Sequence, residues 1–338
     1  MQPTLKYGLT IRLNTKGLQL HEHPQGTSTN EIQASQCTVQ PLTSHTLQHK
    51  TRNYEEDEFS KYQKRNAKQG LLIHVPANNQ ATVNLKREIQ GDCIYHILVI
   101  VEDNATLKLI DEYSGSPNSH HSAVEIIAYE NSKVQYATIQ DLDSGFDFVN
   151  YRARTHKNAH IDWFVAQYGA DLSRAVIDTE LVGEHSSTRS YGTYMGDHSQ
   201  QFDRSDAAMH VGNHTASDMN TKGVLLGSSK AVFRGTIDID SQAFTCDGYQ
   251  KNHTLLLSEN AVADAIPNLE IRNNDVKCSH GATIGRIDEE HLFYLTSRGL
   301  SKQEAKRILI QGFLNDLCAK LEWDELLTRI HPYTEKKL

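Results

Sequence analysis

Alternating apolar and polar positions recur along this chain at a fixed interval, and no helical pattern competes with them between residues 70 and 275. The interval is visible when four segments are aligned: VEDNATLKLIDEY (101–113), AYENSKVQYATIQ (128–140), HKNAHIDWFVAQY (156–168) and GEHSSTRSYGTYM (183–195). Each segment has a polar turn, a small residue and then alternation. The small residues recur every 27 positions, with a looser copy 29 residues further on: Ala105, Ser132, Ala159, Ser186 and Thr215.

This period predicts a solenoid. Each copy is rich in β-branched and aromatic residues and has room for two or three strands of four to seven residues. A fixed period with several strands and no helix is typical of a parallel β-helix, in which each coil stacks its inward residues on the next. We therefore predict a mainly β fold, a right-handed parallel β-helix over residues 70–287. A β-sandwich is the alternative, but its strands need not recur at a fixed interval.

The two ends of the chain differ from this core. Residues 1–69 predict N-terminal strands, with alternation over residues 4–20, and then a short helix or loop over residues 43–69 that covers one end of the solenoid. Later copies of the turn, after Thr215, keep the residue types without the period.

After Gly285 the apolar period changes from two to 3.6, which predicts a small helical domain over residues 288–338. Its helix boundaries are marked by an N-cap aspartate, a C-terminal glycine, a capping box and a proline stop: Asp288, Gly299, Ser301 with Glu304, and Pro332. The second helix has an apolar face that is larger than a helix covering the end of the solenoid needs: Ala305, Ile308, Leu309, Gly312, Phe313 and Leu317. Part of that face is available for a partner.

Composition narrows the function. The 338 residues carry 42 acidic and 34 basic side chains, and no basic block, so we expect no nucleic-acid binding. No run approaches the length of a transmembrane helix and no signal peptide is recognisable, so we expect no membrane partner and a cytoplasmic location. The five cysteines include no CxxC pair, which argues against a disulfide framework.

The candidate metal ligands are Cys278 and His280, in the stretch VKCSHGATIG. Residues i and i+2 of a strand project to the same face, so we expect that the thiolate and the imidazole are able to reach one iron ion, one zinc ion or one another. A packed, inert cysteine is the alternative, because free cysteine is among the most buried residue types.

Other candidate clusters compete with this pair. His120 with His121, and His210 with His214, suggest metal sites, but we expect exposed or hydrogen-bonded side chains because a spacing of four does not converge on a strand. A set of carboxylates fits a β-helical carbohydrate-active enzyme with acid and base groups in an outer groove: Asp141, Asp143, Asp147, Asp203 and Asp206. Aspartate is also a common turn residue. No phosphate-binding loop is present.

Three long stretches of the C-terminal part are specific enough to compare with known families: VFRGTIDI (232–239), HTLLLSENAVADAIPNLEI (253–271) and DVKCSHGATIGRIDEEHLFYLTSRGL (275–300). With the following EAKRILIQGF, they resemble the SufB/SufD family of iron–sulfur cluster assembly scaffolds. Weaker matches extend the resemblance to roughly residues 66–320. The family implies a β-helix core followed by a helical C-terminal domain.

The resemblance implies a non-catalytic scaffold that holds a transient iron–sulfur cluster and no permanent cofactor. It implies dimerisation through the β-helix and docking of a SufC-type ABC ATPase on the C-terminal helices. The expected docking residues are Leu292, Phe293, Leu295, Ile308 and Phe313. The electron donor, with a flavin among the options, is not specified.

Between the two branches, CSHGAT is closer to SufD. The SufB branch has a glutamate where this chain has Gly281, and a cysteine where it has Asn252 and His253. The resemblance therefore assigns His280 as the SufD-type ligand and Cys278 as a neighbouring thiol. Members usually have a longer N-terminal region, so the partner is either a SufB-like subunit or a second copy of this chain, whose symmetry would supply two Cys278 and two His280.

Overall fold

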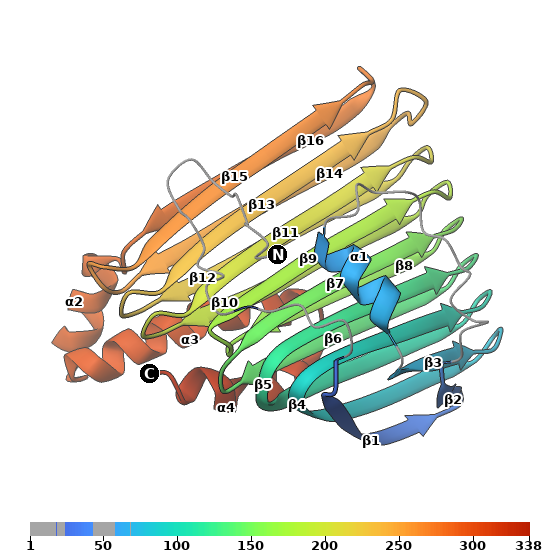
Figure 1. Ribbon diagram of the computed structural model, residues 1–338. Coiled ribbons are helices and arrows are strands. Elements are labelled where there is room, and N and C mark those ends of the chain that lie inside the picture. Colours follow the sequence, from blue (N-terminus) through green and yellow to red (C-terminus); the bar gives the residue numbers. More distant parts are fainter. Residues whose placement is uncertain (1–17, 19–23, 43–57, 68) are drawn as a thin grey trace.

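The chain forms a solenoid with two walls of parallel strands, which confirms the predicted parallel β-helix (Figure 1). The computed structural model describes residues 18, 24–42, 58–67 and 69–338. The predicted strands over residues 4–20 lie outside the described residues, apart from Leu18. One wall contains β6 (Lys133–Leu142), β8 (His160–Gln167), β10 (Ser187–Gly196), β12 (Ala216–Leu225), β14 (Cys246–Leu256) and β16 (Val276–Gly285). The other contains β7 (Phe146–Thr155), β9 (Leu172–Leu181), β11 (Gln201–His210), β13 (Lys230–Ile239) and β15 (Val262–Ile271).

Two long strands join the walls at the start of the solenoid. β4 (Gln80–Val101) and β5 (Thr106–Ala128) pair along their whole length, and β5 then pairs first with β6 and further along with β7. β3 (Gln69–Val75) pairs in parallel with the end of β4. Strands were predicted in the N-terminal region, with alternation noted only over residues 4–20; the described strands there are β1 (Thr27–Ser35) and β2 (Thr38–Pro41), which pair antiparallel with β4 and β3.

The coils are more regular than the sequence pattern indicated. From β6 onward each coil has two strands of eight to eleven residues, rather than two or three strands of four to seven. The register confirms the 27-residue repeat, since Lys133 pairs with His160 and His160 with Ser187. The repeat also continues past Thr215 in longer coils: Lys230 pairs with Val262. The expectation that the fixed 27-residue interval is lost there was confirmed, because Lys230 pairs with a residue 32 positions further on, but the coils themselves continue in register.

The turns on one edge of the solenoid, up to the turn before β14, each contain a residue in the left-handed region. Asn104, Asn131 and Asn158 have φ of 58°, 59° and 56°, a conformation that asparagine tolerates better than most residues. Their side-chain amides bond from coil to coil, Asn131 Nδ2 to Asn104 Oδ1 at 3.1 Å and Asn158 Nδ2 to Asn131 Oδ1 at 2.9 Å. The small residue that follows each of them is fully buried. The turn pattern in the sequence therefore marks this asparagine ladder.

The interior of the first coils is a packed apolar core. Trp163, Tyr136 and Tyr151 are buried and meet edge to face, with ring centroids 5.4 to 6.2 Å apart. A buried ion pair lies among them: Arg87 donates to both oxygens of Asp111 at 2.8 and 2.7 Å. A lone buried charge is costly, so this pair also constrains which coils stack together.

The C-terminal helices lie along the outside of one wall, not across the end of the solenoid (Figure 1). They are α2 (Glu289–Ser297), α3 (Lys302–Lys320) and α4 (Asp324–Glu335). α3 and α4 bury a cluster of apolar side chains against outward residues of β6, β8 and β10: Ile310, Leu314, Leu317, Cys318, Leu326 and Ile330. The predicted apolar face of α3 was therefore partly wrong, because Ile308 is exposed while Ile310 and Leu314 are buried.

Local helix signals were mostly confirmed. Asp288 caps α2, Ser301 and Glu304 form a capping box at α3, and Gly299 has a φ of 98° just after α2. The predicted stop at Pro332 was wrong, because α4 continues through it to Glu335. Among the described residues, no helix is long and apolar enough to cross a membrane.

The predicted helix in residues 43–69 is α1 (Glu58–Asn66). It does not cover an end of the solenoid but packs on the outer face of the wall that contains β7: Phe59 stacks on Phe148 at 4.3 Å, and Asn150 donates to Ser60 at 3.2 Å. Phe148 is an apolar residue on the outer face of this wall, and α1 packs against it. The alternating pattern identified only the residues that point into the solenoid, so it did not predict this contact.

We predict that the asparagine ladder contributes measurably to stability. Asn131→Ala removes two amide hydrogen bonds and leaves an alanine at φ 59°, a conformation that alanine disfavours. The substitution should lower the free energy of unfolding by roughly 1–3 kcal/mol. Asn131→Gly removes the same bonds without the conformational cost, so it should be less destabilising. Urea titration followed by circular dichroism measures both. Equal destabilisation by the two variants would show that the left-handed conformation is not the cause.

Candidate functional site

Cys278 and His280 lie on the last strand of the solenoid. In the parallel register Cys278 pairs with Gly248 and His280 with Gln250, so both point to the interior face that these residues share. β16 ends the path of hydrogen-bonded strands, and among the described strands only β14 pairs with it. The interior face is therefore open at this coil. His280 is exposed and Cys278 is half-buried.

Glycine makes room for the Cys278 thiol. A Cβ at Gly248 would lie 3.2 Å from the Cys278 Sγ and 2.9 Å from a methyl carbon of Ile237. The thiol packs against a small apolar cluster, whose buried members include Ile237, Met219 and Cys246. The sulfur is thus held between the core and the open end of the solenoid.

This environment keeps the Cys278 thiol protonated. Burial raises its pKa, and a backbone hydrogen bond from Gly248 opposes that shift without cancelling it. A metal ligand must be the thiolate, so an ion that binds here displaces a proton. The exposed imidazole of His280, two residues away on the same face, is a side chain of a type that iron accepts. These two side chains fall short of the four ligands that iron–sulfur clusters and structural zinc sites use.

The last coil also exposes apolar side chains. Val262, Ile266 and Ile271 of β15 are 40%, 38% and 38% exposed, and Ile284 of β16 is 40% exposed. Both strands end the sheet path, so each has a free edge that offers backbone hydrogen bonds. Apolar side chains beside free edges are typical of an interface.

The five residues expected to dock a partner do not form one uniform surface. Phe293 is 74% exposed and Ile308 is 46% exposed, on helices that pack against each other. Leu295 is half-buried, and Phe313 is half-buried under Lys222 and edge-on to His253 at 4.9 Å. Leu292 is 4% exposed. Phe293 and Ile308, with the neighbouring Tyr294 at 55% exposure, are the accessible part.

The two histidine pairs were predicted to be exposed or hydrogen-bonded side chains, and three of the four histidines are. His120 is buried and contacts Asp147 Oδ1 through Nδ1 at 2.8 Å, while His121 packs among aromatic rings. His210 is buried, its ring nitrogens contacting Thr215 and Ser217 hydroxyls at 2.8 and 2.9 Å, and burial lowers its pKa to about 4. His214 is exposed and does not converge with His210.

The five aspartates do not share an outer groove. Asp147, Asp203 and Asp206 are buried, and each is held by other side chains. Asp206 pairs with Arg204 inside the solenoid at 3.0 Å, whereas Asp203 pairs with arginines on the outer face. Asp141 pairs with Lys336 and Asp143 accepts a bond from Ser116. This arrangement gives the carbohydrate-active alternative no pair of carboxylates facing one substrate.

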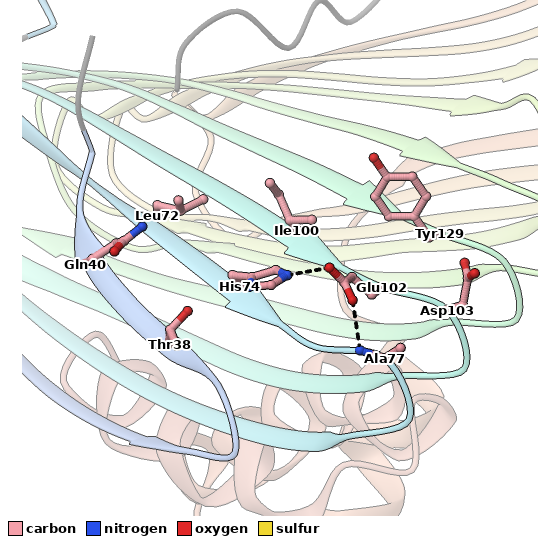
Figure 2. A pocket seen from close by; sticks show the side chains of 9 residues that line it. All are labelled: Thr38, Gln40, Leu72, His74, Ala77, Ile100, Glu102, Asp103 and Tyr129. Atoms are coloured by element: carbon pink, nitrogen blue, oxygen red, sulfur yellow. Dashed lines mark hydrogen bonds and ion pairs between the residues drawn. The ribbon is translucent and has the colours of Figure 1, made fainter. Parts of the chain in front are cut away.

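A pocket of 530 Å³ lies at the other end of the solenoid (Figure 2). Its lining residues come from β2, β3, β4 and the segments that follow β3, β4 and β5: Thr38, Gln40, Leu72, His74, Ala77, Ile100, Glu102, Asp103 and Tyr129. His74 and Glu102 point toward each other at 2.7 Å, and that hydrogen bond is the main cause of a lowered pKa at Glu102. None of the predicted site residues lines this pocket, and its first-coil location separates it from Cys278.

One cluster of ligand-type side chains was not predicted. Glu184, His185 and His214 lie together on the turn edge. The repeat contained a signal for it: His185 and His214 each precede the small residue of their copy, so stacking of the coils brings them side by side. The sequence interpretation had instead grouped His214 with His210.

Most of this chain is similar in sequence to known proteins. A family model described as "SUF system FeS cluster assembly, SufBD core domain" matches residues 84–313. An "Iron-sulfur cluster assembly SufBD family protein" of Synechocystis is 28% identical over 283 residues, which cover 77% of this chain and 59% of that protein. The "Iron-sulfur cluster assembly protein SufD" of Bacillus subtilis is 27% identical over 282 residues, which cover 80% of this chain and 64% of that protein. The chain therefore spans about three fifths of the length of these two relatives.

We predict that Cys278 alkylation is slow at neutral pH. Because burial raises its pKa, the thiolate fraction is below that of an ordinary cysteine, and the rate with iodoacetamide should rise about tenfold per pH unit through pH 9. Peptide mass spectrometry measures this rate. The buried Cys93 and Cys318, whose pKa values burial raises to about 11 and about 12, serve as unreactive controls in the folded chain. A Cys278 rate that levels off below pH 8 would contradict the raised pKa.

Proposed function

Because this chain belongs to the SufBD family of SUF-system iron–sulfur cluster assembly proteins, we propose that it is a SufD-like scaffold subunit on which a cluster is assembled. The observation that carries the proposal is the position of Cys278 and His280, on one face of a terminal strand with a free edge. The cluster is cargo: it forms at the open end and is passed on. The chain itself acts as a scaffold and performs no catalysis.

The nascent cluster forms where two solenoids meet end to end. Two ligands per chain fall short of four, and Val262, Ile266, Ile271 and Ile284 on β15 and β16 are exposed in the part of the chain that the structure describes. A SufB-like subunit supplies the missing ligands in a heterodimer, and a second copy supplies them in a homodimer. Iron binding displaces the proton that burial holds on Cys278.

A SufC-type ABC ATPase is the proposed second partner. Its docking surface is the exposed apolar side of α2 and α3, represented by Phe293, Tyr294 and Ile308. The opposite side of α3 packs against the wall of the solenoid that contains β14 and β16. A movement of these helices would therefore displace the strands of that wall. ATP-driven movement of the helices is thereby coupled to opening of the interface.

We predict that cluster assembly depends on both ligands. Full-length chain, alone and with a SufB-like partner from the same host, is reconstituted anaerobically with ferrous iron and sulfide. The visible absorption of a cluster should appear, and should be lost when Cys278→Ser and His280→Ala are combined. Cys37→Ser is the matched control, because Cys37 is the other half-exposed thiol and lies in the first coil. Equal iron and sulfide content in the double variant would overturn the site, and formation by the chain alone would identify the homodimer.

We predict that the docking surface binds the ATPase through its exposed apolar side chains. Phe293→Asp combined with Ile308→Asp should weaken the binding of the purified SufC-type ATPase at least tenfold, about 1.4 kcal/mol, by isothermal titration calorimetry. Ile32→Asp is the control, since Ile32 is 38% exposed on β1 at the other end of the solenoid. Unchanged affinity in the double variant would place the ATPase elsewhere.

A further inference from the structure

Glu184, His185 and His214 bring three metal-ligating groups together on the surface. Their ligand atoms all lie within 4.8 Å of one another, and among the described residues no other group of three does so. His185 and His214 sit at equivalent left-handed turn positions of successive coils, with φ of 60° and 57°. Their rings stack with centroids 4.8 Å apart and planes inclined by 12°.

The three side chains are available for a ligand. All are exposed, and the His185 Nε2 lies 3.8 Å from the Glu184 carboxylate. No lysine or arginine of the described chain pairs with that carboxylate, so its charge is not neutralised by a neighbour. Metal–ligand bonds of 2.0–2.2 Å bring ligand atoms to roughly 3–4 Å from each other, so rotation of exposed side chains is enough to close the site.

We propose that Glu184, His185 and His214 bind one divalent first-row transition-metal ion. Two imidazoles and one carboxylate leave coordination positions open, as in ferrous sites of the two-histidine, one-carboxylate type. The ion is thus held on the surface in an exchangeable form. Zinc, nickel and cobalt share this ligand preference, so the donor set defines the class of ion.

The position of the site favours ferrous iron as the natural ion, a choice that rests on the proposed function. Backbone hydrogen bonds lead from turn to turn along this edge: His185 N to Asn213 O, His214 N to Phe244 O and Thr245 N to Asp275 O. Asp275 directly precedes β16, three residues before Cys278. The site therefore lies on the edge that ends at the proposed cluster ligands, where it supplies iron close to its point of use.

The asparagine ladder provides a clean variant. Earlier coils hold asparagine at the positions of His185 and His214, so His185→Asn combined with His214→Asn keeps the turn conformation and removes the imidazoles. His198→Asn is the matched control, because His198 is an exposed histidine with φ of 51° that also follows an acidic residue, Asp197. Its coil brings no second histidine beside it.

The test is titration of metal-free full-length chain with cobalt(II) and, anaerobically, with ferrous iron, followed by visible spectroscopy and calorimetry. Wild type and His198→Asn should bind one ion that the double asparagine variant does not, and Glu184→Gln should weaken binding at least tenfold. The Cys278→Ser, His280→Ala variant should keep this ion, which separates the site from the cluster ligands. Equal stoichiometry and affinity in the double asparagine variant would overturn the proposal and leave the two rings as a structural stack. Binding of cobalt without ferrous iron would support the site and overturn its assignment to iron.

Discussion

The hydrogen-bonded register between successive coils is the constraint on which the rest of this structure depends. From β3 onward, each described strand pairs in parallel with the strand one coil away, so each coil must return the chain to the same place. The turns on one edge satisfy this requirement with a left-handed residue, from Asn78 to Thr245, and in the regular coils a small buried residue follows it. Longer coils are accepted because their extra residues enter turns, where the pairing is not disturbed.

The two ends of the solenoid differ in whether their strand edges are paired. At the first coil β1 and β2 pair antiparallel with β4 and β3 and occupy their backbone groups. At the last coil β15 and β16 keep free edges and exposed apolar side chains. Free strand edges favour pairing with another chain, so these described edges fit the partner that we propose. Cys278 and His280 lie at that end, which is why the proposed cluster is placed there.

The helices give the solenoid a second surface. α3 packs along one wall through Ile310, Leu314 and Leu317, and polar contacts such as Lys222 Nζ to the Phe313 carbonyl, at 2.8 Å, fix it there. α2 packs on α3 and leaves Phe293 outside. A helical unit attached along a wall transmits displacement to the strands, whereas a cap across the end would have closed the region that the proposed function requires to be open.

The sequence by itself determined the features that depend on neighbouring residues. The 27-residue period, the parallel β-helix, the caps at Asp288 and Ser301 and the shared face of Cys278 and His280 all follow from local alternation and turn chemistry. Strand lengths were underestimated because strands buried on both faces, such as β8, lose the alternating pattern that marks their extent. Only the tertiary structure decided where α1 and α3 pack, which members of the predicted docking set are exposed and that His185 stands beside His214. Those outcomes depend on contacts between residues far apart in the chain, which no local pattern encodes.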